Sequence, residues 1–199
     1  MISILNLLLQ WDQELLLFLN QIHAPWSDAL WMFCSARFTW IPLYVFWLFV
    51  LHKQYPYPKF IYLLLGVIVL ILLTDQGASS LFKPLVQRLR PCQVPELTQQ
   101  LWLPDKCGGK YGFFSSHAAN AMGLAVFLGY WLKSKPIRLS LLIWMLATSI
   151  SRIFLGAHFP GDIIAGWVWG FGIAMLVIVG IRKWILKTPG LMVNNITNL

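Results

Sequence analysis

Residues 137–179 read IRLSLLIWMLATSISRIFLGAHFPGDIIAGWVWGFGIAMLVIV. Two apolar segments, 137–154 and 162–179, meet at a polar stretch, SRIFLGAHFPGD, which runs from Ser151 to Asp162. Segments of this length approach the roughly twenty apolar residues that cross the hydrocarbon core of a bilayer. The sequence therefore predicts two membrane helices joined by a turn with an arginine, a histidine and an aspartate, groups that a membrane does not bury cheaply.

Three more apolar segments precede this pair, at residues 28–51, 60–82 and 117–132. Only 11% of the 199 residues are charged, and the longest polar stretch is about 83–115. The composition therefore leaves no room for a soluble domain. We predict an all-α fold, in which residues 1–199 form one integral membrane domain: a polytopic helical bundle with about five transmembrane helices.

The N-terminal segment 4–22 is different, because polar side chains interrupt its apolar run. The charged ones are Asp12 and Glu14. The amides, which recur at helical spacing, are Asn6, Gln10, Gln13 and Asn20. This pattern predicts an amphipathic helix lying at the membrane interface rather than a sixth span. The segment lacks the basic flank and cleavage site of a signal peptide, so we expect a mature chain, with a flexible tail at 188–199.

The net charge of +8 lies in short loops between the predicted spans. The basic residues after the first span, between the third and fourth, and after the fifth are Lys53, Lys59, Lys133, Lys135, Arg138, Arg182, Lys183 and Lys187. With five spans these loops share one side, which the positive-inside rule makes cytoplasmic. The charge therefore indicates orientation and not nucleic-acid binding. The stretches 83–116 and 151–162 are then extracytoplasmic.

Two of the outer stretches carry polar residues with two possible roles each. In KPLVQRLRP (residues 83–91), Lys83 and Arg90 are seven residues apart, which places them near one helical face, two turns apart. Two interpretations are open: the two cations bind one anion together, or each side chain extends separately to lipid headgroups. In FSSH (residues 114–117), the serines and the histidine contribute to the same site or cap the helix that follows.

The third outer stretch, SRIFLGAHFPGD, places Asp162 four residues after His158. Its carboxylate can accept a hydrogen bond from one imidazole nitrogen, which leaves the other free to act as a nucleophile. The alternative is a pair that only ties the turn. With Arg152, the outer face offers three cations, neutral donors and two histidines, a set that suits a tetrahedral anion. Only one carboxylate stands at useful spacing, so no metal site is expected.

The order and spacing of these stretches resemble the three-part signature of the type 2 phosphatidic acid phosphatase family. Residues 83–91 fit K-x6-R-P, residues 114–117 approximate P-S-G-H, and residues 151–162 fit S-R-x5-H-x3-D. The likeness covers about residues 63–179. The middle motif departs from the pattern, with Phe in place of Pro at 114 and Ser in place of Gly at 116.

The resemblance implies a bacterial enzyme that needs no metal or other cofactor. It makes His158 the nucleophile that becomes phosphorylated, Asp162 its orienting partner and His117 the general acid. The phosphate-binding residues that it implies are Lys83, Arg90, Ser115, Ser116 and Arg152. Together with the orientation inferred from the basic loops, this predicts a multi-pass protein of the bacterial inner membrane, with the site facing the periplasm or the exterior.

We therefore predict a phosphatase that hydrolyses a phosphomonoester or diphosphate on a membrane lipid. Undecaprenyl diphosphate, phosphatidylglycerophosphate, phosphatidic acid and lipid A all fit, and the oligomeric state is left open. The first alternative is a vanadate-binding enzyme, because vanadium haloperoxidases have a similar signature. The second is a non-enzymatic lipid or solute transporter, which needs polar groups at several depths of the membrane.

Two residue pairs complete the predictions. Arg37 and Asp75 fall at similar depths in their spans, roughly 12 Å from the outer ends at 1.5 Å per residue, and are predicted to pair there. Cys92 and Cys107 flank a fifteen-residue segment of an outer loop, on an oxidising side, and are predicted to form a disulfide. Cys34 is then a buried apolar residue of the first span.

Overall fold

The computed structural model describes residues 4–36, 38–104 and 107–187. In chain order its α-helices are α1 (Ile4–Asn20), α2 (Pro25–Ser35), α3 (Ile41–Gln54), α4 (Tyr57–Gln76), α5 (Lys83–Val86), α6 (Pro95–Thr98), α7 (Ser116–Trp131), α8 (Lys135–Phe154) and α9 (Pro160–Lys187). A π-helix, η1 (Gly77–Phe82), joins α4 to α5, and a 3-10 helix, η2 (Pro91–Gln93), lies in the following loop. The only β-pairing within the described ranges is an isolated bridge. The all-α prediction is confirmed.

Three helical runs among the described residues are long and apolar enough to cross a membrane: Tyr57–Val86, Lys135–Phe154 and Pro160–Ile185. The first is α4, η1 and α5 in one continuous run. Helix α7 has 16 residues, which is short for a crossing. The membrane class of the fold is confirmed, whereas the number of crossings stays a prediction.

The prediction of one continuous span over 28–51 is wrong, because this segment forms two helices. Helix α2 ends at Ser35, and Ala36 is extended, with φ −71° and ψ 133°. Helix α3 begins at Ile41 with Pro42 in its first turn, where a missing backbone N–H costs least. A proline inside an apolar run is a signal for a helix boundary that the hydropathy pattern alone conceals.

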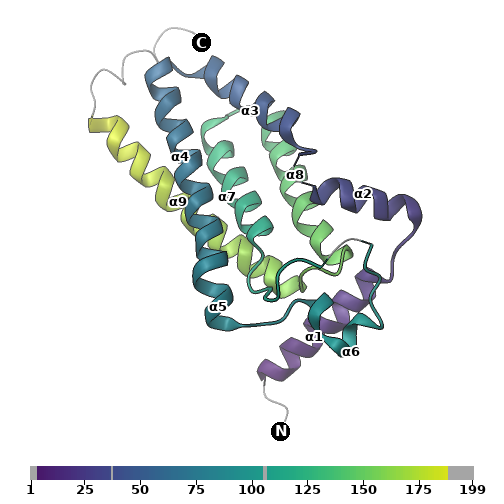
Figure 1. The fold of residues 1–199 in the computed structure, drawn as a ribbon. Coiled ribbons are helices and arrows are strands. Elements are labelled where there is room, and N and C mark those ends of the chain that lie inside the picture. Colours follow the sequence, from purple (N-terminus) through teal and green to yellow (C-terminus); the bar gives the residue numbers. More distant parts are fainter. Residues whose placement is uncertain (1–3, 37, 105–106, 188–199) are drawn as a thin grey trace.

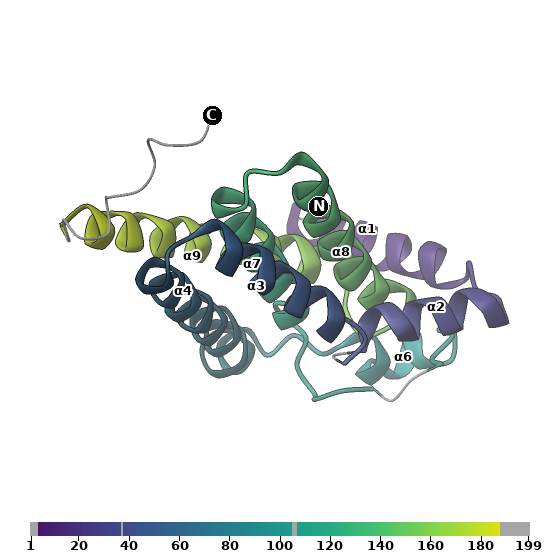
Figure 2. The same cartoon turned by 90° about the horizontal axis from the view of Figure 1, so that it is seen from above.

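Helix α7 is the centre of the bundle and packs against α4, α8 and α9 (Figure 1). Seen from above, α3 crosses over this group, and α1 lies to the side of α8 (Figure 2). Large buried side chains from four helices fill the core: Trp47, Leu51, Leu63, Leu70, Phe127 and Trp144. Burial of these side chains aligns the ends of the helices at which the polar motifs lie.

Helices α7 and α9 approach closely because small residues face each other across the contact. A Cβ atom at Gly166 would lie 2.7 Å from the Ser115 carbonyl oxygen. At Gly170 it would lie 3.0 Å from the backbone nitrogen of Gly123. Small residues four apart bring membrane helices into backbone contact in this way. The contact holds the start of α7 against the start of α9.

Helix α1 covers the end of the bundle from which α9 begins (Figure 1). Leu16 and Asn20 are buried against the bundle, and the Asn20 side-chain amide donates to the carbonyl oxygens of Trp102 and Phe154 at 2.9 and 2.8 Å. Its outward face is apolar and exposed, with Ile4, Leu8, Trp11, Leu15 and Phe18. An exposed apolar face beside a polar one confirms the amphipathic helix.

The loop that follows α5 covers the same end and carries the predicted disulfide. The Arg90 N–H donates to the Lys110 carbonyl at 3.1 Å, and the Gly112 N–H to the Arg88 carbonyl at 2.8 Å. The structure joins Cys92 to Cys107, with Cα atoms 5.8 Å apart. The paired segments and the crosslink fold the loop back over the start of α9.

Other predicted features have mixed outcomes. Cys34 is a buried free thiol, as predicted. Arg37 and the tail 188–199 lie outside the described residues, so the Arg37–Asp75 pair and the flexible tail stay predictions.

Candidate active site

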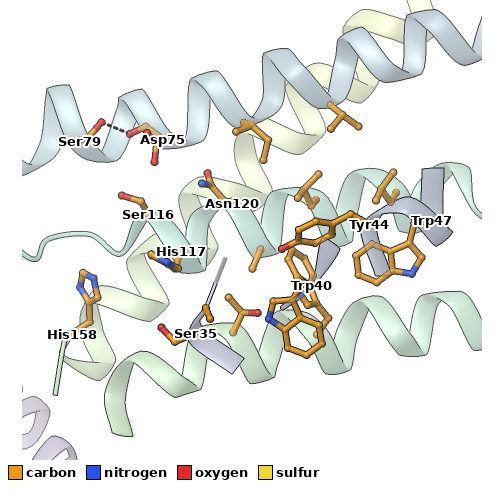
Figure 3. Close-up of a pocket in the computed structure, with 18 of the residues that line it drawn as sticks. Ser35, Trp40, Tyr44, Trp47, Asp75, Ser79, Ser116, His117, Asn120 and His158 are labelled. Atoms are coloured by element: carbon orange, nitrogen blue, oxygen red, sulfur yellow. Dashed lines mark hydrogen bonds between the residues drawn. The ribbon is translucent and has the colours of Figure 1, made fainter. Parts of the chain in front are cut away.

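A cavity of about 710 Å³ brings the three sequence motifs together. Five of the predicted site residues line one end of it: Lys83, Arg90, Ser116, His117 and His158. From there the cavity continues between the helices towards Trp40, Tyr44 and Trp47 of the α3 region (Figure 3). One end is therefore cationic and the other is aromatic and apolar.

The turn between α8 and α9 places His158 in this cavity. Gly156 has φ +63°, a left-handed conformation that suits glycine. The N–H groups of Ala157 and His158 both donate to the carbonyl oxygen of Arg152, at 2.9 and 3.2 Å. This compact turn holds the imidazole with only 1% of its surface exposed.

Asp162, in the first turn of α9, lies behind the imidazole. Its Oδ2 is 3.5 Å from the Nδ1 atom of His158 and accepts from the Phe159 N–H at 3.1 Å. The 3.5 Å separation is longer than an ordinary hydrogen bond. Because Nδ1 faces the carboxylate, Nε2 is the nitrogen available for chemistry in the cavity.

The electrostatic surroundings keep His158 neutral. Burial lowers the pKa of its imidazole well below the usual value. Three nearby cations, Arg90, Arg152 and Lys83, lower this pKa further. A backbone contact with Gly112 raises it in part. A neutral imidazole at neutral pH has a lone pair for nucleophilic attack.

The FSSH stretch divides its residues between structure and site. Ser115 is the N-cap of α7: its Oγ accepts from the Ala118 N–H at 3.4 Å, and its own N–H donates to the Asp162 carbonyl at 3.1 Å. Ser116 lines the cavity and accepts a hydrogen bond from the Lys83 Nζ at 2.9 Å. His117 also lines the cavity. The capping interpretation therefore describes Ser115, whose phosphate-binding role stays a prediction.

Lys83 and Arg90 reach one cavity, but a shared helical face is not the reason. Helix α5 ends at Val86, and Gln87 is left-handed, with φ 52°. Arg90 is extended and is held by backbone pairing with the end of the loop; its Nε donates to the Tyr111 carbonyl at 3.3 Å. The helical spacing argument was wrong for this pair, and tertiary pairing brings the two cations together.

Arg152 extends from α8, and its Nη1 donates a hydrogen bond to the hydroxyl of Ser35, a residue of α2 that lines the cavity. Phe114, which replaces the proline of the family pattern, is buried against Phe82 and Trp169. The substituted position is thus used for packing, next to the start of α7.

Sequence reasoning missed two charged residues beside the site. Arg88 donates from Nη1 to Asp162 Oδ1 at 2.9 Å and from Nη2 to Asp12 Oδ2 at 2.6 Å. The expectation of a single nearby carboxylate was therefore wrong, because α1 adds Asp12 and Asp75 lines the cavity. The available signals were a second arginine in KPLVQRLRP and a lone acid within an apolar helix.

The arrangement matches a known family. The model of the PAP2 superfamily matches residues 60–186. The chain belongs to the PAP2 superfamily. Two curated relatives carry the name lipid A 4'-phosphatase. The protein of Bacteroides thetaiotaomicron is 34% identical over 81% of this chain and 73% of its own length. The protein of Porphyromonas gingivalis is 33% identical over 87% of this chain and 71% of its own length.

Solved structures share the PAP2 fold with this chain. A PAP2-type phosphatidylglycerolphosphate phosphatase from Bacillus subtilis superposes with a TM-score of 0.68 at 21% identity, over 89% of this chain and 88% of that one. Aquifex aeolicus LpxE superposes with a TM-score of 0.57 at 21% identity, over 83% of this chain and 93% of that one. The predicted family is confirmed, and the chain is a membrane lipid phosphatase of this superfamily.

Proposed function

We propose that this PAP2 phosphatase hydrolyses a phosphate monoester on the polar headgroup of a lipid of the lipid A type, and that the reaction proceeds through a phosphohistidine. One observation carries the proposal: a single cavity joins the His158 site to an apolar interior. Its apolar wall consists of Trp40, Tyr44, Trp47, Leu48, Val67, Ile71, Ala121, Leu124, Leu128 and Trp144. When the phosphate is bound at the cationic end, this apolar wall can contact the hydrocarbon part of the lipid.

In the first step the His158 Nε2 attacks phosphorus, forming an N–P bond as the ester P–O bond breaks. His117 donates its proton to the departing oxygen. Asp162 stabilises the positive charge that develops on the imidazole, and its 3.5 Å separation from Nδ1 is expected to shorten as that charge appears. In the second step water attacks phosphorus, and His117, now neutral, takes a proton from this water. The N–P bond breaks, which restores His158 and releases inorganic phosphate.

The cations supply the electrostatic part of catalysis. Lys83 and Arg90 line the cavity beside the imidazole. Donors already fixed where negative charge develops on the phosphoryl oxygens stabilise the transition state without reorganisation. No three His, Cys, Asp or Glu side chains in the described part of the chain are grouped to hold a metal ion. Metal independence stays a prediction that chelation tests.

The preference for a monoester on a polar headgroup rests on three further polar side chains that line the cavity. Asn120 lines it between the phosphate end and the aromatic end, whereas Asp75 and Ser79 lie at the phosphate end, across the cavity from Ser116 and His158 (Figure 3). Hydroxyl and amide groups of a sugar can hydrogen-bond to these side chains. The Asp75 carboxylate lies close enough to Lys83 to affect its charge, so it adds negative charge at the phosphate end. A diphosphate carries more negative charge than a monoester and is repelled more strongly there. The names of the two curated relatives agree with this choice.

The proposed location is the extracytoplasmic side of a bacterial inner membrane. The basic loops predicted to be cytoplasmic lie at the other ends of the helices from the site. The disulfide between Cys92 and Cys107 is at the end that carries His158, which suits an oxidising compartment. In intact spheroplasts, a membrane-impermeant thiol reagent should label a cysteine introduced at the exposed Gln99 without permeabilisation. Labelling only after permeabilisation would reverse the orientation.

The activity test is phosphate release by purified protein from four lipids: lipid A, phosphatidic acid, phosphatidylglycerophosphate and undecaprenyl diphosphate. Lipid A should be the best substrate, chelator should leave the rate unchanged, and His158→Ala should be inactive on all four. Asp75→Asn should raise diphosphate turnover relative to lipid A. Quenching wild-type turnover of labelled substrate in alkali should recover phosphate on His158. No release from any lipid would contradict the proposal.

A further inference from the structure

The guanidinium of Arg88 bridges two carboxylates that are remote in the sequence. It lies 2.9 Å from Asp162 Oδ1 and 2.6 Å from Asp12 Oδ2. Asp162 is fully buried, and the Arg88 and Asp12 side chains are only 19% and 12% exposed. Charge-assisted hydrogen bonds with this little exposure are screened much less than surface ion pairs.

Asp12 has a second contact beside the site. Its Oδ1 accepts the Gly161 N–H at 2.6 Å, so it holds the backbone one residue before Asp162. The Arg88 guanidinium also lies over the Phe159 ring, 4.0 Å from its centroid. Asp12 and Arg88 therefore contact the α8–α9 turn at Phe159 and Gly161 as well as at the Asp162 carboxylate.

Helix α1 is fixed strongly enough to serve as this support. Asn20 clamps it through both atoms of its amide, because Oδ1 accepts the Trp102 N–H at 2.7 Å while Nδ2 donates to two carbonyls. Leu16 is buried one helical turn after Asp12. Yet α1 lies outside residues 60–186, the part matched by the superfamily model. Asp12 is thus an addition from outside the matched core.

The charges explain why two carboxylates share one arginine. Arg88 alone would neutralise Asp162 and weaken its stabilisation of a positive imidazole at His158. Asp12 offsets the arginine, so the triplet Asp12–Arg88–Asp162 keeps one net negative charge. Arg88 can then orient Asp162 without removing its electrostatic effect.

We propose that Asp12 and Arg88 are positioning residues, through which helix α1 holds the Asp162 carboxylate beside His158 and preserves its negative charge. The inference rests on the proposed phosphohistidine chemistry. Neither residue needs to touch the substrate.

The test compares Asp12→Asn with Glu14→Gln in the full-length enzyme. Glu14 is on the same helix, is exposed and accepts a hydrogen bond from Gln10 at 2.8 Å, so its substitution removes the same charge without touching the site. We expect Asp12→Asn to lower kcat about tenfold, with little change in KM, in line with the cost of losing an outer-shell partner. Glu14→Gln should keep the wild-type kcat, and Asp12→Glu should restore part of the loss.

The pH profile separates positioning from simple structural support. The charged and titratable groups around His158 are Asp162, Lys83, Arg90, Arg152 and His117, with Asp75 across the cavity and with Arg88 and Asp12 behind Asp162. Asp12→Asn removes a negative charge, so the acid limb of kcat/KM should move to lower pH. Arg88→Gln removes a positive charge, so the limb should move to higher pH while kcat also falls.

Opposite shifts of the two variants would support the proposal. Shifts in the same direction, or an Asp12→Asn variant with the kcat and pH profile of Glu14→Gln, would overturn it. If Asp12→Asn does not fold, the direction of the Arg88→Gln shift decides the question. Retained turnover in His158→Ala would instead refute the proposed function, whereas a dead His158→Ala beside a normal Asp12→Asn refutes only the positioning role.

Discussion

Replacing Gly166 by alanine tests whether the contact between α7 and α9 sets the geometry of the site. The new Cβ would lie 2.7 Å from the Ser115 carbonyl oxygen and 3.2 Å from the Ala119 backbone nitrogen. Ordinary contact begins at 3.4 Å, so the start of α7 must move by about 0.7 Å. Because Ser115 precedes Ser116 and His117, this displacement moves cavity residues away from the start of α9.

Gly172→Ala is the matched control. Gly172 is on the same helix as Gly166, and a Cβ atom there would meet nothing within 4 Å. The gain in helix propensity is common to both substitutions, so their difference isolates the steric effect. We expect Gly166→Ala to be less stable than Gly172→Ala by about 1–3 kcal/mol, the usual cost of overpacking. Its kcat should fall by a factor of about ten to a hundred, since a misplacement of about 1 Å can cost a hundredfold.

Stability is measured by thermal unfolding in one detergent, and kcat by phosphate release from the same preparations. If Gly166→Ala and Gly172→Ala have equal stability and equal kcat, the close approach of the helices does not control the site. A loss of stability without a loss of kcat would also refute the reasoning, because it would show that α7 can move while the geometry of the reaction persists.

Three further predictions concern the chemistry and the outer loop. His117→Ala should slow an alkyl phosphomonoester about a hundredfold to ten-thousandfold and an activated aryl phosphate far less; equal effects in a comparison of the two esters would make His117 a binding or capping residue. The pKa of His158 is lower in the folded protein than in the unfolded chain, so the unfolded chain binds a proton first as pH falls below about 6.5. The free energy of unfolding should therefore decrease from about pH 6.5 down to the folded pKa, and unfolding measured as a function of pH checks this. Reducing the Cys92–Cys107 disulfide should lower stability by up to about 3 kcal/mol, and recovery of both thiols alkylated in non-reduced peptides would contradict the crosslink.

The sequence was most informative where function depends on residues close together in the chain. His158 and Asp162 are four residues apart, and a turn leading into a helix brings side chains at that spacing together. The length and apolarity of the segments likewise predicted a membrane helical bundle, because the bilayer sets the number of residues in a crossing.

Apolar periodicity was least reliable at boundaries and at bends. Residues 28–51 are apolar throughout, yet Pro42 starts a new helix and the Trp40 indole bonds back to the Cys34 carbonyl at 2.9 Å across the break. Arg90 was placed in the correct cavity for the wrong reason, since its position depends on pairing with Lys110, twenty residues later. Hydropathy predicts whether a segment is surrounded by water or by apolar groups, but it does not predict where the backbone turns.

The amino-acid sequence alone therefore predicted the class of fold, the family and the residues closest to the proposed chemistry. Only the tertiary structure brought Asp12 and Arg88, 76 residues apart in the chain, to the buried carboxylate of Asp162. Local geometry fixes a pair four residues apart, and a sequence displays that spacing directly. A contact across 76 residues depends on the free energy of packing α1, the outer loop and α9 together. No single segment of the sequence shows that these three elements will meet.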